Sequence, residues 1–172
     1  MKILSALALL IGLNSYAAAD ITVPMNAVNE TGVAKPMGFI TISESPYGLV
    51  FTPALEGLGA GVHGFHVHEN PDCAAKDKDG KAVAALAAGA HYDPKASQHH
   101  GKPWGEGHLG DLPGLVAGTD GKASYPVLAP RLKISDIQSR ALIIHSGGDN
   151  YADTPASLGG GGARIACGVI KN

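Results

Sequence analysis

Histidines are the residues of this chain with the clearest capacity for chemistry, and there are eight of them. The stretch GFHVHENPDC places His66 and His68 one residue apart, with Cys73 close behind. Residues two positions apart on an extended strand point to the same face, so these two imidazoles would stand side by side. Because imidazole is a common ligand of zinc and copper, the pair predicts part of a metal site carried by a strand.

Further donors lie later in the chain. His145 follows the apolar run ALII, so we expect it at the end of a buried strand. Between residues 74 and 112 there is little strand signal, and a loop of that length inside a compact domain is usually functional or disordered. This loop could fold over the strand ligands with four more donors, His91, His100, His108 and Asp111.

The number of donors suggests two metal sites that share one ligand. Six histidines and one aspartate make seven donors, whereas two four-coordinate sites need eight. An imidazole that loses both ring protons can bridge two metals, and His91, the loop histidine nearest the strand pair in sequence, is the predicted bridge. One site would then have four nitrogens, which suits copper, and the other three nitrogens and a carboxylate, which matches tetrahedral zinc. The alternative is that the histidines are unrelated.

The start of the chain predicts export. A basic start precedes an apolar run over residues 3–13 and the sequence NSYAAAD, a pattern typical of a secretory signal peptide. We expect cleavage after Ala19, or one or two residues earlier, so that residues 1–19 are the signal and residues 20–172 form one domain. The run is too short for a membrane span, which needs about 20 apolar residues. The alternative is a buried first helix.

Export also bears on whether the two cysteines, Cys73 and Cys167, form a disulfide. In an oxidising compartment an even number of cysteines favours a disulfide over two buried thiols. In the chain-entropy model, a bond that closes a loop on the order of 100 residues contributes about 4–5 kcal/mol to stability.

Composition excludes one class of partner. The chain has 13 basic and 15 acidic residues, a net charge of −2, and removal of the signal removes one lysine and leaves −3. No basic stripe interrupts this balance, so the sequence predicts no nucleic-acid binding. No second long apolar run follows the signal, so it also predicts no membrane insertion of the mature domain.

Short, β-rich segments separated by turn residues predict an all-β domain, an antiparallel sandwich or barrel. The expected strands are ITVPMNAV, MGFITISE, GLVFTP, VHGFHVHE, ASYPVLA, RALIIHS and ARIACGVI. The stretch KAVAALAAGA, residues 81–90, is rich in alanine and could be either a short helix or an ordered loop.

Four stretches together identify a family. GFHVHENPDC, GAHYDP, HGKPWGEGHLGDLPG and GGGGARIACGVI resemble, in order, the signature stretches of copper/zinc superoxide dismutases of the exported bacterial branch. The resemblance covers the chain from Asp20 to Asn172. It implies an immunoglobulin-like Greek-key β-barrel or sandwich of about eight antiparallel strands with long metal-binding loops, so the strand list above is one short.

The resemblance implies the ligands position by position. The copper ligands implied by FHVHE, GAHYDP and ALIIHS are His66, His68, His91 and His145. The zinc ligands implied by GAHYDP, HHGKP and HLGD are His91, His100, His108 and Asp111. In HHGKP the family histidine directly precedes the glycine, so His99 is left without a role.

Three further residues have implied roles. Arg164 matches the arginine beside the copper that receives the anion, and His63 matches a structural histidine that steadies the backbone near the copper strand. Asp149, in GGDN, resembles the aspartate that links a copper-ligand histidine to a zinc-ligand histidine, although Asp153 is close by.

The implied activity is the dismutation of superoxide to dioxygen and hydrogen peroxide in the periplasm, with one copper and one zinc ion per subunit, as an antioxidant defence. Copper cycles between two oxidation states, while His91 takes up and returns a proton and zinc sets the basicity of the shared ring. Arg164, always charged and with a planar fork, would dock the small anion, so Arg164 and His91 are the implied catalytic residues.

The chain departs from the eukaryotic pattern in its charged loops. The stretch between His145 and Arg164, which steers substrate in eukaryotic members, is short here and rich in glycine and alanine. The loop after His68 instead carries three lysines interspersed with aspartates, and whether they steer superoxide is open. These lysines are Lys76, Lys78 and Lys81.

Competing interpretations are a metal carrier, a copper-only member of the fold and a structural sandwich. A carrier of copper would favour thioether ligands, yet there are only three methionines and one is the initiator. Intact His100, His108 and Asp111 argue against a copper-only protein. A structural protein would leave the histidines unexplained. Bacterial members occur as monomers and as dimers, so a homodimer is possible, but the strands show no interface.

Overall fold

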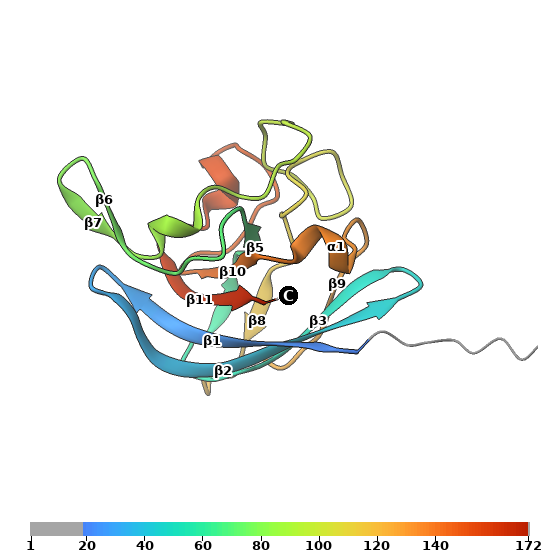
Figure 1. Ribbon diagram of the computed structural model, residues 1–172, viewed down its shortest axis with the longest axis horizontal. Coiled ribbons are helices and arrows are strands. Elements are labelled where there is room, and N and C mark those ends of the chain that lie inside the picture. The colour runs from blue at the N-terminus through green and yellow to red at the C-terminus, as the bar shows by residue number, and fades with distance from the viewer. Residues whose placement is uncertain (1–18, 172) are drawn as a thin grey trace, which may run out of the picture.

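A computed structural model describes residues 19–171. These residues form an antiparallel β fold in which a curved seven-stranded sheet wraps around one core, with irregular loops gathered at one side (Figure 1). The order across the sheet is β5-β10-β11-β1-β2-β3-β9, so strands distant in sequence lie together, as in a Greek key. The predicted signal peptide lies outside the described residues apart from Ala19.

The seven strands of the large sheet are β1 (Ile21–Asn29), β2 (Gly32–Ser45), β3 (Gly48–Leu55), β5 (Phe65–His68), β9 (Val127–Ala129), β10 (Arg140–His145) and β11 (Arg164–Ile170). Two smaller pairs are β4 (Gly61–His63) with β8 (Leu115–Ala117), and β6 (Lys76–Lys78) with β7 (Lys81–Val83). Helical turns are short and are η1 (Leu86–Ala88), α1 (Ile134–Ile137) and η2 (Ser157–Gly160). Within the described part, no helix is long and apolar enough to cross a membrane.

The prediction of an all-β Greek-key domain is confirmed, and each predicted strand segment contains a strand. The segment VHGFHVHE is divided at Gly64 into β4 and β5, because Gly64 pairs with His145 and Gly147. With these two counted as one interrupted strand, and without the β6–β7 arm, the barrel has eight strands. The one missing from the sequence-based list is β8, a three-residue strand whose alternation is too short to detect.

The alanine-rich stretch 81–90 forms neither of the two alternatives in full. It starts as strand β7 and continues into the single 3-10 turn η1. Ala85 and Gly89 on either side of this turn both have a positive φ, so an α-helix cannot run through them. Tertiary packing outweighs the helix propensity, because Ala85, Ala87 and Ala88 are all buried.

Alternation along the strands separates the core from the site. On β5, Phe65 and Val67 point into the main core, whereas His66 and His68 point to the other face. A second small apolar cluster lies on that other face and includes Ile143 and Cys167, which pair with each other across β10 and β11. The barrel interior is therefore apolar, while the loop-covered outer face of β5, β10 and β11 is available for polar side chains.

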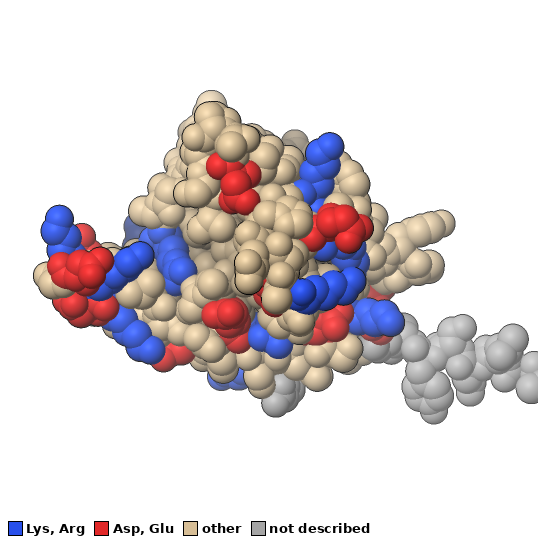
Figure 2. Space-filling view, turned by 90° about the horizontal axis from the view of Figure 1, so that it is seen from above, with Lys and Arg blue, Asp and Glu red and all other residues tan. Residues whose placement is uncertain are grey.

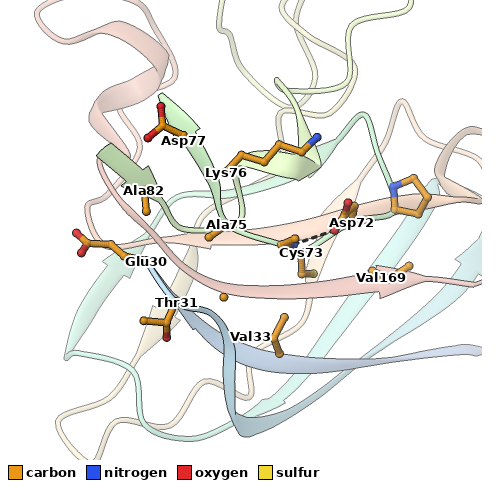
Figure 3. A pocket seen from close by; sticks show the side chains of 13 residues that line it. Glu30, Thr31, Val33, Asp72, Cys73, Ala75, Lys76, Asp77, Ala82 and Val169 are labelled. Carbon is orange, nitrogen blue, oxygen red and sulfur yellow. Dashed lines mark hydrogen bonds between the residues drawn. The ribbon is translucent and has the colours of Figure 1, made fainter. Parts of the chain in front are cut away.

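The β6–β7 hairpin forms a charged arm at one edge of the molecule (Figure 1). Its basic and acidic side chains are exposed and intermixed at the left end of Figure 2. Beneath the arm, a groove runs between Lys76 on the arm, Glu30 and Thr31 at the β1–β2 turn, and Cys73 (Figure 3). The arm thus departs from the barrel next to the disulfide.

Candidate metal centre

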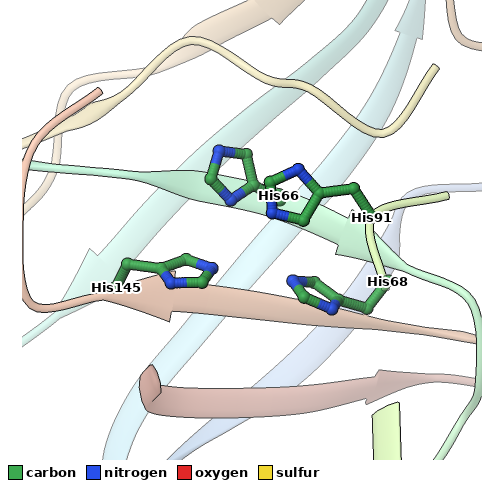
Figure 4. Close-up of side chains that lie close together, drawn as sticks. All are labelled: His66, His68, His91 and His145. Atoms are coloured by element: carbon green, nitrogen blue, oxygen red, sulfur yellow. The ribbon is translucent and has the colours of Figure 1, made fainter. Parts of the chain in front are cut away.

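Four imidazoles converge on the outer face of the sheet (Figure 4). Two of them come from β5, one from the end of β10 and one from the loop that follows η1, and one nitrogen from each lies within 4.8 Å of the others. All four side chains are almost completely buried. They are His66, His68, His91 and His145, the set that the sequence predicts for copper.

Hydrogen bonds fix the tautomers of three of these rings. His68 Nδ1 lies 2.9 Å from Gly89 O and His145 Nδ1 lies 3.2 Å from Gly162 O. A carbonyl can only accept, so each Nδ1 carries the proton and each Nε2 keeps its lone pair. His66 Nε2 lies 2.8 Å from an Asp149 carboxylate oxygen, so its lone pair remains on Nδ1.

The lone-pair nitrogens are then left without partners. His66 Nδ1, His68 Nε2 and His145 Nε2 are buried and form no hydrogen bond. Buried polar atoms are seldom left unsatisfied, so three such atoms pointing to one place indicate a site for a cation. Nitrogen donors in this number suit copper, and the residues therefore fit the metal.

Burial keeps these imidazoles neutral, which is the state a metal needs. It lowers the pKa of His66 to about 3, despite the hydrogen bond from its ring to Asp149. It also lowers the pKa of His145 to about 4 and places that of His68 well below its usual range. The positive charge of Arg164 adds to the lowering for His68 and His145.

The outer edge of β5 places His91 and Asp111. Val67 exchanges backbone hydrogen bonds with the two neighbouring loop segments, accepting from Tyr92 N at 2.9 Å and donating to Gly110 O at 2.9 Å. These contacts set His91 opposite His68 and Asp111 opposite His66. A side chain at Gly110 would collide with Val67 O, so the loop can approach the strand this closely only with glycine.

A second set of donors surrounds the Asp111 carboxylate. Three imidazole Nδ1 atoms lie close to its Oδ1, at 3.0 Å for His91, 3.0 Å for His100 and 3.2 Å for His108. Ligand atoms of a tetrahedral zinc ion with bonds of ~2.0 Å are separated by ~3.3 Å. His100 Nδ1 is buried and is not aligned for a hydrogen bond to this oxygen, as expected of two atoms that face a common cation. The four residues therefore fit zinc.

His91 belongs to both sets, as predicted for a bridge. Its Nδ1 faces Asp111 on the zinc side, which leaves Nε2 for the copper side. By distance alone His66 also falls near His91, His100 and Asp111. Its Nε2 is already bound to Asp149, however, so its free nitrogen belongs to the copper set.

The protonation of the zinc side differs from that of the copper side. Burial alone would raise the pKa of Asp111, but the three imidazoles close to its carboxylate hold it well below its usual range. Burial alone would lower the pKa of His100, yet Asp111 and Asp149 raise it to about 9. A metal-free zinc site at neutral pH therefore holds a proton on His100.

Asp149 links the two sets through the ring nitrogens that face away from the metal sites. Its Oδ2 lies 2.8 Å from His66 Nε2 and its Oδ1 lies 2.8 Å from His100 Nε2. Asp153 instead accepts from two backbone amides, His100 N at 2.9 Å and Leu158 N at 3.0 Å. The residue with the geometry of the predicted link is thus Asp149. Gly159 closes over this contact, and a Cβ there would collide with Asp149.

Arg164 lies at the start of β11 directly opposite His145, where a β-bulge interrupts the pairing of β10 and β11. Its guanidinium is half-buried and donates 2.6 Å hydrogen bonds to Ala85 O and Gly89 O. Gly89 O also accepts from His68, so one carbonyl fixes both the arginine and a copper-set imidazole. Burial lowers the pKa of Arg164 without removing its charge.

The remaining predicted residues are placed as follows. The two ring nitrogens of His63 lie 2.8 Å from His145 O and from Gly59 O, so His63 connects the β4 end to the β10 end as a structural residue would. His99 is exposed and outside both sets. Cys73 and Cys167 form the predicted disulfide. Among the arm lysines, Lys81 lines the same groove as Arg164, whereas Lys76 lines the groove of Figure 3.

Sequence reasoning did not find the backbone acceptors. Gly89 O and Gly162 O orient two imidazoles, and Gly110 allows the loop to reach β5. A carbonyl has no signature in the sequence, so no residue pattern could have pointed to these atoms. The glycines themselves were visible, but a glycine-rich sequence gives no reason to single out three of them.

Comparisons with known proteins agree with this geometry. The family model described as "Copper/zinc superoxide dismutase (SODC)" matches residues 37–170. A superoxide dismutase [Cu-Zn] of Neisseria meningitidis is 55% identical over 155 residues, covering 89% of this chain and 83% of that protein. One from Pasteurella multocida is 62% identical over 137 residues, covering 78% of this chain and 74% of that protein.

Solved structures give the same result. The Cu/Zn superoxide dismutase from Brucella abortus superposes with a TM-score of 0.87 at 56% identity, covering 89% of this chain and 100% of that chain. The monomeric copper, zinc superoxide dismutase from Salmonella enterica superposes with a TM-score of 0.81 at 52% identity, with the same coverage.

Proposed function

Because this chain belongs to the copper/zinc superoxide dismutase family, we propose that its two converging sets of side chains divide the work of superoxide dismutation between them. The first set would hold copper and consists of His66, His68, His91 and His145. The second would hold zinc and consists of His91, His100, His108 and Asp111. The single observation that carries the assignment is the convergence of buried, unpartnered lone-pair nitrogens on one point between β5 and β10.

Bound copper supplies the one-electron redox chemistry, and bound zinc supplies a fixed positive charge on the far side of the shared ring. His91 would hold a proton at Nε2 during the reduced half of the cycle and deliver it to the second superoxide. His91 Nδ1 lies 3.0 Å from Asp111 Oδ1 and both atoms would hold zinc, so the ring would keep its direction while Nε2 gains and loses its proton. Asp149 holds His66 and His100 in the tautomers that both sites need.

Arg164 would dock the substrate anion. Two of its N–H groups are used by Ala85 O and Gly89 O, which fix the plane of the fork, and further N–H groups remain. The protein has a net negative charge, so attraction of superoxide must be local. Lys81 shares the groove at Arg164 and is the arm lysine that we expect to assist.

Metal analysis of the purified protein, together with a superoxide-consumption assay, tests the assignment. We expect one copper and one zinc per chain and rapid turnover. Membership of the superoxide dismutase family argues against the alternative of a metal carrier. A carrier would release its metal to a chelator without consuming superoxide. Loss of both metals at equal rates from a His108→Ala variant would contradict the division into two sets.

Export to the periplasm is a further proposal. The chain is homologous to bacterial copper/zinc superoxide dismutases, and the pattern of residues 1–19 supports a cleaved signal peptide. The disulfide between Cys73 and Cys167 agrees with an oxidising compartment. Mass spectrometry of a periplasmic extract should find a protein that begins near Asp20 and has no free thiol. An uncleaved start would refute the proposal.

Self-association through the β4–β8 face is a separate proposal. Val62 and Val116 pair directly across these strands and are about half exposed. Gly114, just before β8, donates a 3.1 Å hydrogen bond to the Tyr151 hydroxyl, and the Tyr151 ring is 6.3 Å from that of the exposed Trp104. Exposed apolar side chains such as these can bury themselves against a second copy. Sedimentation should show a homodimer that Val62→Asp converts to a monomer; a monomeric wild type would end the proposal.

A further inference from the structure

Arg131 attaches the loop of the zinc set to the barrel. It lies between β9 and α1, and its half-buried guanidinium donates three hydrogen bonds to backbone carbonyls of the loop. The acceptors are Pro103 O at 2.8 Å from Nε, Gly107 O at 2.9 Å from Nη1 and His108 O at 2.6 Å from Nη2. All three contacts are to backbone carbonyls, so Arg131 touches no imidazole or carboxylate of either metal set.

The backbone on either side of Arg131 is anchored in the barrel. Ala129, at the end of β9, pairs with Leu49 on β3 and is buried. Leu132 on the other side of Arg131 is 2% exposed and belongs to the main core. The arginine is therefore held on both sides by residues that cannot move without opening the barrel.

The loop that it holds has little order of its own. Residues 102–109 contain no strand or helix, and their other backbone hydrogen bonds are short-range, such as Gly105 N to Lys102 O and His108 N to His99 O. Leu109 packs against the core only in part. His108, the residue in this segment that carries an imidazole to Asp111, would otherwise be held only by these short-range backbone hydrogen bonds.

We propose that Arg131 is a positioning residue that clamps His108 for zinc, by fixing the carbonyls of the two peptide bonds on either side of this residue. This inference rests on the proposed zinc set. The planar fork of arginine presents several N–H groups in fixed directions, whereas lysine offers a single mobile ammonium group. Hydrogen bonds from a charged donor are also stronger than those between neutral groups. Arginine is thus suited to hold three carbonyls at once.

The test uses the full chain, loaded with copper and zinc, in three variants. Arg131→Gln removes the charge and the fork, Arg131→Lys keeps the charge, and Lys102→Gln removes a charge from an exposed lysine of the same loop. Zinc release to a chromogenic chelator and copper release to a copper-selective chelator are followed separately. Hydrogen exchange of residues 99–110 is measured in the metal-free protein.

We expect Arg131→Gln to release zinc 10- to 100-fold faster, the usual effect of losing a partner that orients a ligand. Copper release should stay within about twofold, because the copper set is carried by β5, by β10 and by the loop after η1, none of which Arg131 contacts. Arg131→Lys should be intermediate and Lys102→Gln unchanged. In the metal-free protein, amides of residues 102–109 should exchange faster in Arg131→Gln than in wild type.

Two results would overturn the clamp. One is wild-type zinc release with wild-type exchange of 102–109 in both Arg131 variants. The other is an equal acceleration of copper and zinc release, which would indicate general destabilisation. If Arg131→Gln does not fold, Arg131→Lys and its exchange pattern decide alone. A His108→Ala variant that retains zinc normally would refute the zinc set instead, and the exchange measurement would still decide the clamp.

Discussion

Replacement of Asp149 by alanine should weaken both metal sites, and the zinc site more. The carboxylate lies 2.8 Å from His66 Nε2 and 2.8 Å from His100 Nε2, so one substitution removes two charge-assisted hydrogen bonds. Each ring then loses the partner that keeps its proton away from the metal-facing nitrogen. A hydrogen bond to a charged group contributes about 1.5–3 kcal/mol. This corresponds to the roughly 10- to 100-fold loss of metal affinity that accompanies loss of such a partner.

The two rings differ in what else holds them. His66 is on β5, where its backbone pairs with Ile143, and its ring stacks on His91 at a centroid distance of 4.0 Å. His100 is on a loop, and its ring has lost its anchor once Asp149 is gone. We therefore expect zinc affinity to fall toward the upper end of that range and copper affinity toward the lower end.

Competitive titration with chelators of known affinity measures both metals in the same sample. The matched control is Asp153→Ala, which also removes a carboxylate bound near His100 but one that is exposed and binds backbone amides. Water can replace an exposed acceptor, so we expect a change of less than about threefold. Wild-type affinities in Asp149→Ala, or a larger loss in Asp153→Ala, would refute this account of the link.

Three further expectations concern charge and metal. Arg164→Glu should slow turnover most, Arg164→Ala less and Arg164→Lys least. The turnover rate of the wild type should fall as salt rises, while the Glu variant should lose that dependence. Wild-type kinetics in all three variants would show that Arg164 does not act on the substrate. His145→Ala should abolish turnover with most of the fold intact, whereas His100→Ala should lower thermal stability and leave partial activity; equal effects in a paired assay would contradict the two sets. In the metal-free protein, the lowered pKa values of His66 and His145 mean that the unfolded chain takes up protons below about pH 6.5 that the folded one refuses, so urea stability should fall as the pH drops from 6.5 toward 4. The raised pKa of His100, about 9, acts in the opposite direction between pH 6.5 and 9, so that stability should peak near pH 6.5, and a flat profile would contradict both shifts.

Ligand identity could be predicted from the sequence because it depends on residue types and on short-range geometry. The alternation that puts His66 and His68 on one face follows from strand periodicity alone, and the structure shows it. The shared ligand His91 followed from counting donors, without any distance. These inferences need no knowledge of the long-range fold.

The hydrogen bonds that position the loops could not be predicted from the sequence. The carbonyls of Gly89 and Gly162 orient two imidazoles, and Arg131, which is 23 residues from His108, donates to the His108 carbonyl. Such contacts depend on tertiary packing, and neither the acceptor nor the donor belongs to a pattern along the chain. The conformation of the alanine-rich stretch 81–90 could not be predicted for the same reason, because burial of its alanines outweighs their helix propensity.

The disulfide connects these observations physically. Cys167, Ile143 and His66 form one row across β11, β10 and β5, so the bond is anchored on the face that carries the copper set. From Cys73 the chain runs through the arm to Gly89, whose carbonyl holds both His68 and Arg164. The bond therefore fixes the start of this segment, and the arginine and imidazole fix its end. Reduction should loosen the groove at Arg164 and slow turnover before it releases copper. Three of the four copper-set imidazoles are on β5 and β10, whose strand pairing does not depend on the disulfide. A copper loss that precedes the loss of activity on titration with a reductant would show that this order is wrong.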